Sequence, residues 1–126
     1  MNPNRDKSYR TSDVKSQLSV SGIAIMGRPI DHQTRCEHYH SSLDIVAIKF
    51  KCCDQYFPCY QCHEETAGHT AEMWTKEDRD VKAILCGVCG FEMTILDYFS
   101  CRNQCPGCHS NFNPDCEKHY QLYFEL

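Results

Sequence analysis

The sequence lacks any long apolar run. No stretch of its 126 residues approaches the roughly 20 consecutive apolar residues that a helix needs to cross a bilayer. The first 21 residues are polar and contain no apolar segment of the kind that a secretory signal requires. Asp6 and Asp13 lie among the basic residues of this stretch, whereas a mitochondrial presequence is poor in acids. We therefore expect residues 1–21 to be a disordered polar tail, and we expect an intracellular, cytoplasmic protein that does not bind membranes.

An excess of basic charge is also missing. The formal net charge is −4, with 13 Lys and Arg residues against 17 Asp and Glu residues. Proteins that bind nucleic acid normally present a basic surface that displaces counterions from the phosphates. The charge balance therefore argues against a nucleic-acid partner.

Aliphatic and aromatic residues are fewer than the overall hydrophobic content suggests, because the 41% figure includes all 11 cysteines. A chain of this length forms one domain, which we place at residues 22–126, and a small core usually needs additional cross-links. An odd cysteine count and a reducing compartment both disfavour a disulfide framework. Bound metal is the better explanation for the cysteines.

Four segments predict secondary structure. Residues 43–50, "LDIVAIKF", alternate in the manner of a β-strand. Residues 74–85 predict a short helix capped by Thr75, and residues 91–100 predict a strand that turns into a helix capped at Thr94. Residues 120–126 predict a closing strand. The expected fold is therefore a small, irregular α+β domain with short strands and one or two short helices.

The strongest motif is a set of closely spaced metal-binding pairs. Two residues between cysteines allow both thiolates to approach one zinc ion at about 2.3 Å. One such pair is also typical of thioredoxin-like redox sites, but several pairs in one chain favour zinc over redox chemistry. The pairs are Cys59 with Cys62, Cys86 with Cys89, Cys105 with Cys108, and the shorter Cys36 with His38.

Cys52 and Cys53 are adjacent, directly after the predicted strand 43–50. Successive side chains of an extended segment point to opposite faces. If the strand geometry continues, the two thiolates bind different zinc ions. The same argument assigns Cys62 and its neighbour His63 to different ions. Neighbouring residues then bind alternate zinc ions, and a distant pair completes each site, which we call an interleaved zinc cluster.

The stretches "TRCEHYHSS", "CGVCG" and "CPGCHSNFNPDC", with the Cys-x-His-Tyr start at Cys36, resemble the CHY-type zinc finger family. This resemblance runs from about residue 22 to residue 126. It implies three zinc ions, each held by three cysteines and one histidine. The fold class that the resemblance implies is therefore a small, irregular α+β zinc-cluster domain, cross-braced by three zinc sites. The implied first site is Cys36, His38, Cys59 and Cys62; the second is Cys52, His63, Cys105 and Cys108; the third is Cys53, His69, Cys86 and Cys89.

Within the family, the chain is most similar to small stand-alone members, which include a fungal assembly helper of the mitochondrial intermembrane space. The resemblance to that branch implies a role in zinc and thiol handling, with the intermembrane space as the alternative location. Another branch joins the finger to a RING module in ubiquitin ligases. With the chain ending at residue 126, no RING is expected, so a link to ubiquitin ligation would be indirect.

Several other polar residues allow alternative sites. Cys116 and His119 have metal-ligand spacing and could form a fourth metal site with His40 or Cys101, although buried thiols and hydrogen-bonded imidazoles are the simpler interpretation. The adjacent Glu64 and Glu65 resemble the catalytic carboxylates of zinc hydrolases. A catalytic zinc needs an open position, which four protein ligands at each ion leave unavailable.

We therefore expect a monomeric, non-enzymatic zinc-binding protein with three structural zinc ions. Its predicted role is that of a protein-interaction or thiol/zinc-handling accessory factor, with a protein partner or a Cys-rich client and no nucleic acid. Either the zinc ions only stabilise the fold beneath a surface that binds a partner, or zinc exchanges with the client protein. A zinc-dependent or thiol-redox enzyme and an adaptor linked to ubiquitin ligation are the alternatives.

Overall fold

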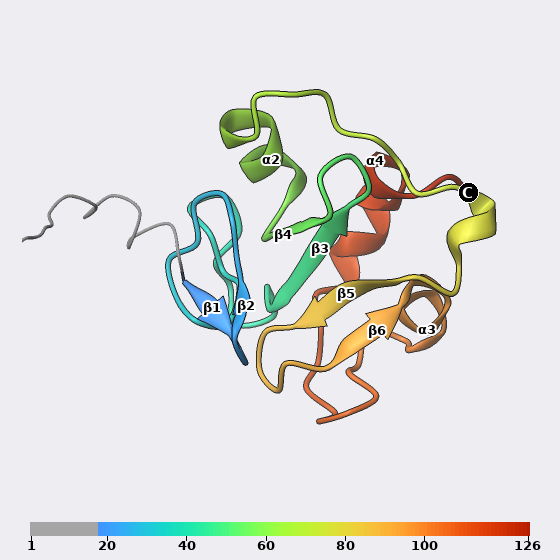
Figure 1. The fold of residues 1–126 in the computed structure, drawn as a ribbon. Helices are drawn as coiled ribbons and strands as arrows, with labels where there is room; N and C mark the ends of the chain where they lie inside the picture. Colours follow the sequence, from blue (N-terminus) through green and yellow to red (C-terminus); the bar gives the residue numbers. More distant parts are fainter. Residues whose placement is uncertain (1–17) are drawn as a thin grey trace, which may run out of the picture.

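The computed structural model describes residues 18–126, and residues 1–17 of the expected tail lie outside it. The described chain opens with a small antiparallel hairpin of β1 (Ser19–Val20) and β2 (Ile23–Ala24), at the left of Figure 1. This hairpin begins three residues before the expected domain boundary at residue 22. The division into tail and domain stays a prediction.

A four-stranded antiparallel sheet forms the centre of the fold, with strand order β4-β3-β5-β6 (Figure 1). The strands are β3 (Val46–Phe50), β4 (Gln55–Phe57), β5 (Lys82–Cys86) and β6 (Glu92–Thr94). Strand β3 confirms the strand predicted within residues 43–50. Both of its faces are covered, because Ile48 packs in the largest core cluster and Ala47 packs in a second cluster with Leu85 of β5.

The helix predicted over residues 74–85 is wrong for most of its length. Only a 3₁₀ turn, η1 (Lys76–Asp78), forms there, and Thr75 caps it with the expected reciprocal bonds to Asp78. The chain then enters β5, where Ala83 to Cys86 are fully buried between β3 and β6. A continuous apolar run of this length suits a strand that is covered on both faces, and periodicity alone does not distinguish it from a buried helix.

The prediction of a strand that turns into a helix over residues 91–100 is confirmed. Strand β6 ends at Thr94, which caps α3 (Ile95–Ser100) through a capping box with Asp97. Helix α2 (Tyr60–Thr66) lies between β4 and η1 in the chain, and its N-cap is Cys59.

The closing strand predicted over residues 120–126 is wrong. Asn113 caps a 3₁₀ segment, η2 (Pro114–His119), which continues into the single turn α4 (Tyr120–Tyr123). Proline in the first turn favours this helical start. Helical spacing brings Tyr120 and Phe124 together on the core, where Tyr98 lies 5.4 Å from the Tyr120 ring. Phe124 keeps one strand-like bridge, to Trp74.

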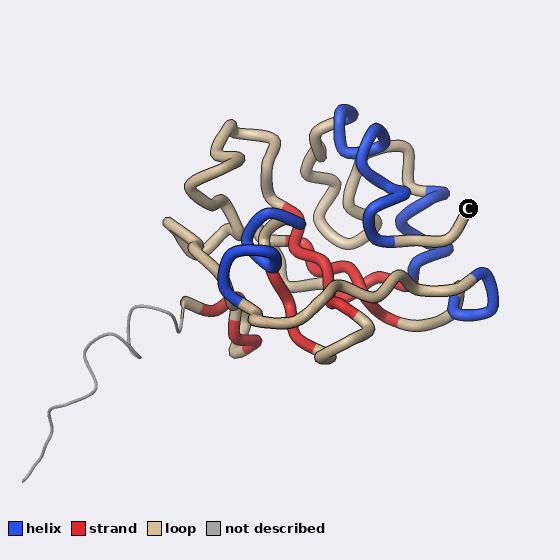
Figure 2. Tube along the Cα trace, turned by 90° about the horizontal axis from the view of Figure 1, so that it is seen from above, coloured by secondary structure: helices blue, strands red, loops and turns tan. Residues whose placement is uncertain are grey.

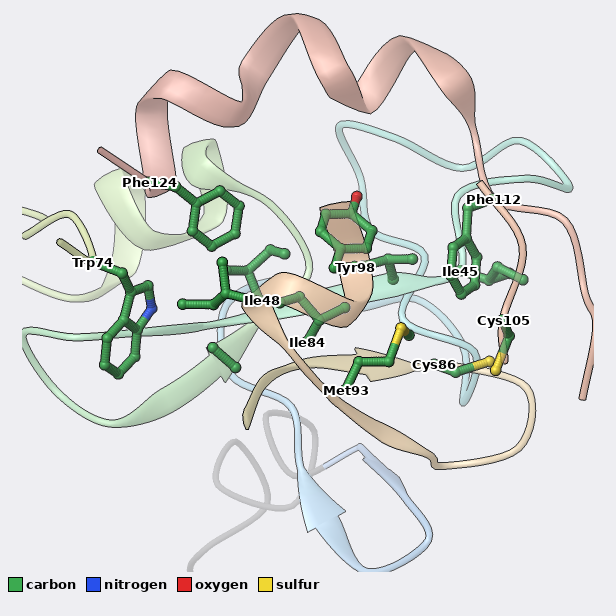
Figure 3. Close-up of a cluster of buried hydrophobic side chains, with 13 residues drawn as sticks. Ile45, Ile48, Trp74, Ile84, Cys86, Met93, Tyr98, Cys105, Phe112 and Phe124 are labelled. Carbon is green, nitrogen blue, oxygen red and sulfur yellow. The ribbon is translucent and has the colours of Figure 1, made fainter. Parts of the chain in front are cut away.

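The main core lies between the sheet and the carboxyl-terminal helical segment (Figure 3). Its labelled aromatic residues, Trp74, Tyr98, Phe112 and Phe124, surround the aliphatic side chains of β3 and β5. Loops make up much of the remaining chain (Figure 2). The expected fold class, a small α+β domain with short strands and short helices, is confirmed. Across residues 18–126, no helix has the length and apolar character to cross a membrane.

Candidate metal centres

Three groups of four Cys and His side chains converge in the described part of the chain. Within each group, the donor atoms lie within 4.8 Å of one another. We name each group after its first residue. The Cys36 site contains Cys36, His38, Cys59 and Cys62; the Cys52 site contains Cys52, Cys53, His63 and His69; the Cys86 site contains Cys86, Cys89, Cys105 and Cys108.

The donor separations fit tetrahedral zinc. With Zn–S near 2.3 Å and Zn–N near 2.0 Å, a tetrahedron has edges of about 3.8 Å for S–S, about 3.6 Å for S–N and about 3.3 Å for N–N. In the Cys36 site, Cys36 and Cys59 are 3.7 Å apart. In the Cys86 site, the Cys86–Cys108 and Cys89–Cys105 pairs are separated by 3.8 and 3.6 Å. The sulfur separations in these two sites therefore match those of tetrahedral zinc.

The Cys36 site joins a loop to the first turn of α2. A bridge between Pro29 and Cys36 positions the loop. Cys59 is the N-cap of α2, so its sulfur accepts a hydrogen bond from the Cys62 backbone N–H at 3.4 Å. The sulfur of Cys36 likewise accepts one from the N–H of Tyr39. The structure brings these four residues together as expected.

His38 directs Nδ1 toward the three sulfurs of this site, at 3.4–3.8 Å. Its other nitrogen, Nε2, donates to the Glu65 carboxylate at 3.0 Å. Burial acts to lower the pKa of His38, but the bonds to Cys36 and Glu65 raise it above the ordinary value. Such a carboxylate fixes the tautomer and orientation of a metal-binding imidazole. Sequence reasoning missed this role for Glu65, although its position three residues after Cys62 in α2 places both on one helix face.

Gly27 packs directly against the Cys36 site. It has a φ of +84°, and a Cβ atom at this position would lie 2.6 Å from the Cβ of Cys62. Only glycine accepts both the left-handed backbone and this close approach without strain. The segment before Cys36 therefore helps to hold Cys62 in place.

The Cys52 site corrects the expectation that Cys52 and Cys53 bind different ions. Strand β3 ends at Phe50, and residues 51–54 form a tight turn. The N–H of Asp54 returns to the carbonyl of Phe50 at 2.8 Å, and Asp54 has a φ of 59°. Because the backbone is no longer extended, the opposite-face rule does not apply, and the two sulfurs lie 4.0 Å apart.

The remaining donors of the Cys52 site come from α2 and the loop after it. Nε2 of His63 lies 3.2 Å from the sulfur of Cys52 and 3.2 Å from Nε2 of His69. His63 is fully buried and stacks on Phe50 with ring centroids 4.2 Å apart. Burial and the neighbouring His69 lower the pKa of His63, which keeps its imidazole neutral, as a zinc ligand must be.

The Cys86 site joins two tight turns. Cys86 is the last residue of β5, and a turn of residues 87–89 leads to Cys89. Cys105 and Cys108 flank a second turn, in which the Gly107 N–H donates to the sulfur of Cys105 at 3.3 Å. Burial raises the pKa of the Cys86 thiol, so a bound cation is needed to hold it as a thiolate at neutral pH.

The implied second and third sites are therefore corrected. The structure does not join the Cys105 pair to Cys52, nor the Cys86 pair to Cys53; it joins the two pairs to each other. The donor sets are Cys₃His, Cys₂His₂ and Cys₄ instead of three Cys₃His sets. The twelve candidate residues all fall in the three clusters, but their grouping differs from the one implied by the resemblance.

The remaining candidate ligands lie apart from these clusters. The sulfur of Cys101 donates to the carbonyl of Tyr98 at 3.2 Å, at the end of α3. Cys116 and His119 line a cavity of about 70 Å³ beside the core. Within residues 18–126, no metal-binding group includes Cys101, Cys116, His40 or His119. The fourth site considered from the sequence therefore does not form in this part of the chain.

Comparison with known proteins decides the family. The CHY zinc finger family model matches residues 36–114, which contain all three clusters. The chain belongs to the CHY zinc finger family. The family assignment and the three donor sets identify a zinc-binding protein with three zinc ions per chain.

Relatives extend the similarity to most of the chain. It is 46% identical over 100 residues to Helper of Tim protein 13 of Kluyveromyces lactis, covering 79% of this chain and 87% of that protein. It is 45% identical over 105 residues to Helper of Tim protein 13 of Saccharomyces cerevisiae, covering 81% and 90%. An uncharacterised protein of Schizosaccharomyces pombe is 36% identical over 112 residues, covering 89% and 98%.

Proposed function

We propose that the chain is a non-enzymatic accessory factor in the assembly of Tim proteins, with its twelve Cys and His ligands grouped as in the three clusters. The observation that carries this proposal is the combination of three four-donor sites with similarity to two proteins named as helpers of a Tim protein. Its client would be a cysteine-rich Tim protein, and its place of action the mitochondrial intermembrane space.

The donor sets support an accessory role over catalysis. Each site supplies four Cys or His side chains, and a zinc ion with four protein ligands has no open position for substrate. Glu65, which resembled a catalytic carboxylate in the sequence, is engaged with Nε2 of His38 and with Arg28 at 3.2 Å. Its geometry is that of a carboxylate that orients a ligand.

Exposed apolar side chains offer contact points for a protein client. Val88 and Phe91 flank the Cys86 site, and both are 40% exposed or more. Both lie beside Cys89, the exposed cysteine of that site. A client segment can therefore contact apolar side chains and a metal-bound sulfur together.

Capture of the client by the full, zinc-loaded chain tests the proposal. We expect tagged protein added to a mitochondrial intermembrane-space extract of the host to retain a Tim protein in its thiol form. A matched variant, Val88→Ser with Phe91→Ser, should retain less of it while still binding three zinc ions. Absence of Tim proteins from the captured fraction, or equal capture by zinc-free and zinc-loaded protein, would contradict the proposal.

A further inference from the structure

The three zinc sites differ in how deeply their ligands are buried. Three of the four ligands are buried at the Cys36 site and two at the Cys86 site. At the Cys52 site only His63 is buried, while Cys52 and Cys53 are partly exposed and His69 is exposed. A competing ligand from solvent therefore reaches most of the Cys52 donor set without any opening of the fold.

The sites also differ in the groups that support their ligands. The Cys36 site has N–H donors to two sulfurs and the Glu65 carboxylate on His38. The Cys86 site has the Gly107 N–H on Cys105, and Ser110 lies 3.2 Å from the sulfur of Cys108. Such outer partners typically raise metal affinity about 10- to 100-fold each.

The Cys52 site has fewer supporting groups. The Nδ1 atom of His63 is buried and has no hydrogen-bond partner in the described part of the chain. Metal-binding histidines almost always place this second nitrogen on a carboxylate, a carbonyl or water. The sulfur of Cys52 contacts Cys53 and His63, both members of the same site, and the sulfur of Cys53 has the backbone N–H of Gln55 as a donor.

The core beneath the Cys52 site also holds His63 through aromatic packing. His63 is held by stacking on Phe50 and by an edge contact with Phe57 at 4.9 Å. All four ligands come from the continuous stretch 52–69, whereas the other two sites join segments across the fold. Emptying this site therefore frees one turn and one loop, and leaves the sheet and main core in place.

We infer that the Cys52 site holds the exchangeable zinc of this protein, while the Cys36 and Cys86 sites hold structural zinc. His69 detaches first, because it is exposed and lies in the loop after α2. A stronger zinc ligand would take the freed position, and further bonds from that ligand would replace those from Cys52, Cys53 and His63. No electrons move: zinc leaves as Zn²⁺, and the two thiolates take up one proton each from the solvent or from the incoming thiols.

This inference deepens the zinc-handling part of the proposed function and rests on that function for its biological use. The order of zinc loss, however, is a property of the purified chain. Failure to capture a Tim protein would refute the proposed client without changing the order of zinc loss. Conversely, a different order of zinc loss would refute this inference and leave client capture intact.

Graded removal of zinc from the intact protein tests the inference. The zinc-loaded chain is treated with increasing EDTA, pulsed with N-ethylmaleimide, and examined by native mass spectrometry and peptide mapping. We expect a two-zinc species in which Cys52 and Cys53 are alkylated and the other seven site cysteines are protected. First alkylation at the Cys36 or Cys86 site, or loss of all three zinc ions in one step, would overturn it.

A pair of matched variants adds a second readout. His69→Ala should yield a protein that carries two zinc ions and keeps the circular dichroism spectrum of the wild type. His38→Ala, which removes one histidine from a structural site, should lose that spectrum. Equal unfolding of both variants would contradict the assignment of the Cys52 site as exchangeable.

Discussion

Nε2 of His38 donates a hydrogen bond to the carboxylate of Glu65 at 3.0 Å, while Nδ1 of the same ring faces three cysteine sulfurs. The carboxylate thereby sets which nitrogen is free to bind zinc. Glu65 comes from α2, the same helix that supplies Cys62, so one short helix provides both a ligand and the support of another ligand.

Replacement of Glu65 tests this support. Glu65→Ala should weaken zinc binding at the Cys36 site about 10- to 100-fold, because the imidazole of His38 loses its orienting acceptor. Glu64→Ala is the matched control: it changes the neighbouring residue of the same helix, which makes no bond to His38. Competition with a fluorescent zinc chelator measures the difference, and equal affinities for both variants would remove the role assigned to Glu65.

Alanine substitutions at two glycines with left-handed backbone distinguish the cost of backbone strain from the cost of a steric clash. Gly27 and Gly22 have φ values of +84° and +83°, but only at Gly27 would a Cβ atom meet other atoms within 4 Å. Alanine at either position should cost about 1–2 kcal/mol for the backbone alone. Gly27→Ala should cost more, because it also displaces Cys62. Denaturant unfolding of the zinc-loaded variants measures both, and similar losses would show that the contact with Cys62 is unimportant.

For the adjacent cysteines Cys52 and Cys53, the structure predicts that both bind one zinc ion, whereas their sequence predicted two different ions. Cys52→Ser and Cys53→Ser should each damage the same site, so that the remaining cysteine of the pair becomes the first to react with N-ethylmaleimide. The Cys86 and Cys105 pairs should stay protected in both variants. Cys116→Ser is the control for loss of a thiol outside the clusters, and it should leave three zinc ions bound. Early reaction of different distant pairs in the two variants would restore the interleaved model.

Complete removal of zinc should unfold the domain. Five of the residues in the buried core are site cysteines, so the metal sites and the core share side chains, and the energy of metal binding becomes energy of folding. Circular dichroism after removal of all three ions should show loss of the sheet, and re-addition of zinc should restore it. A spectrum that persists in zinc-free protein would show that the apolar core is sufficient alone.

The residues of the metal sites were predictable from the sequence, but their partition was not. A Cys-x-x-Cys pair is a local turn, so spacing alone identifies Cys86 with Cys89 as one metal-binding pair. Which second pair completes the site depends on where β5 and the loop at Cys105 lie in the fold, and spacing contains no such information. For Cys52 and Cys53, the decisive fact was that β3 ends at Phe50.

The same limit explains the errors in secondary structure. The caps at Thr75 and Thr94 were predictable, because capping depends on residues three apart in sequence. The strand over Lys82–Cys86 was not, because its continuous burial arises from the neighbouring strands β3 and β6. Features that depend on residues close in sequence, such as helix caps, were therefore predictable, whereas features set by tertiary packing were not.

The partition of ligands is the central claim, and cadmium-113 NMR of the cadmium-substituted protein tests it most directly. The average composition of nine sulfurs and three nitrogens is the same for the observed and the interleaved groupings, so an averaged measurement does not separate them. The cadmium chemical shift instead reports the number of thiolates at each ion. The observed structure predicts three resonances, one each for four, three and two thiolates. Three resonances that all indicate three thiolates and one histidine would contradict it.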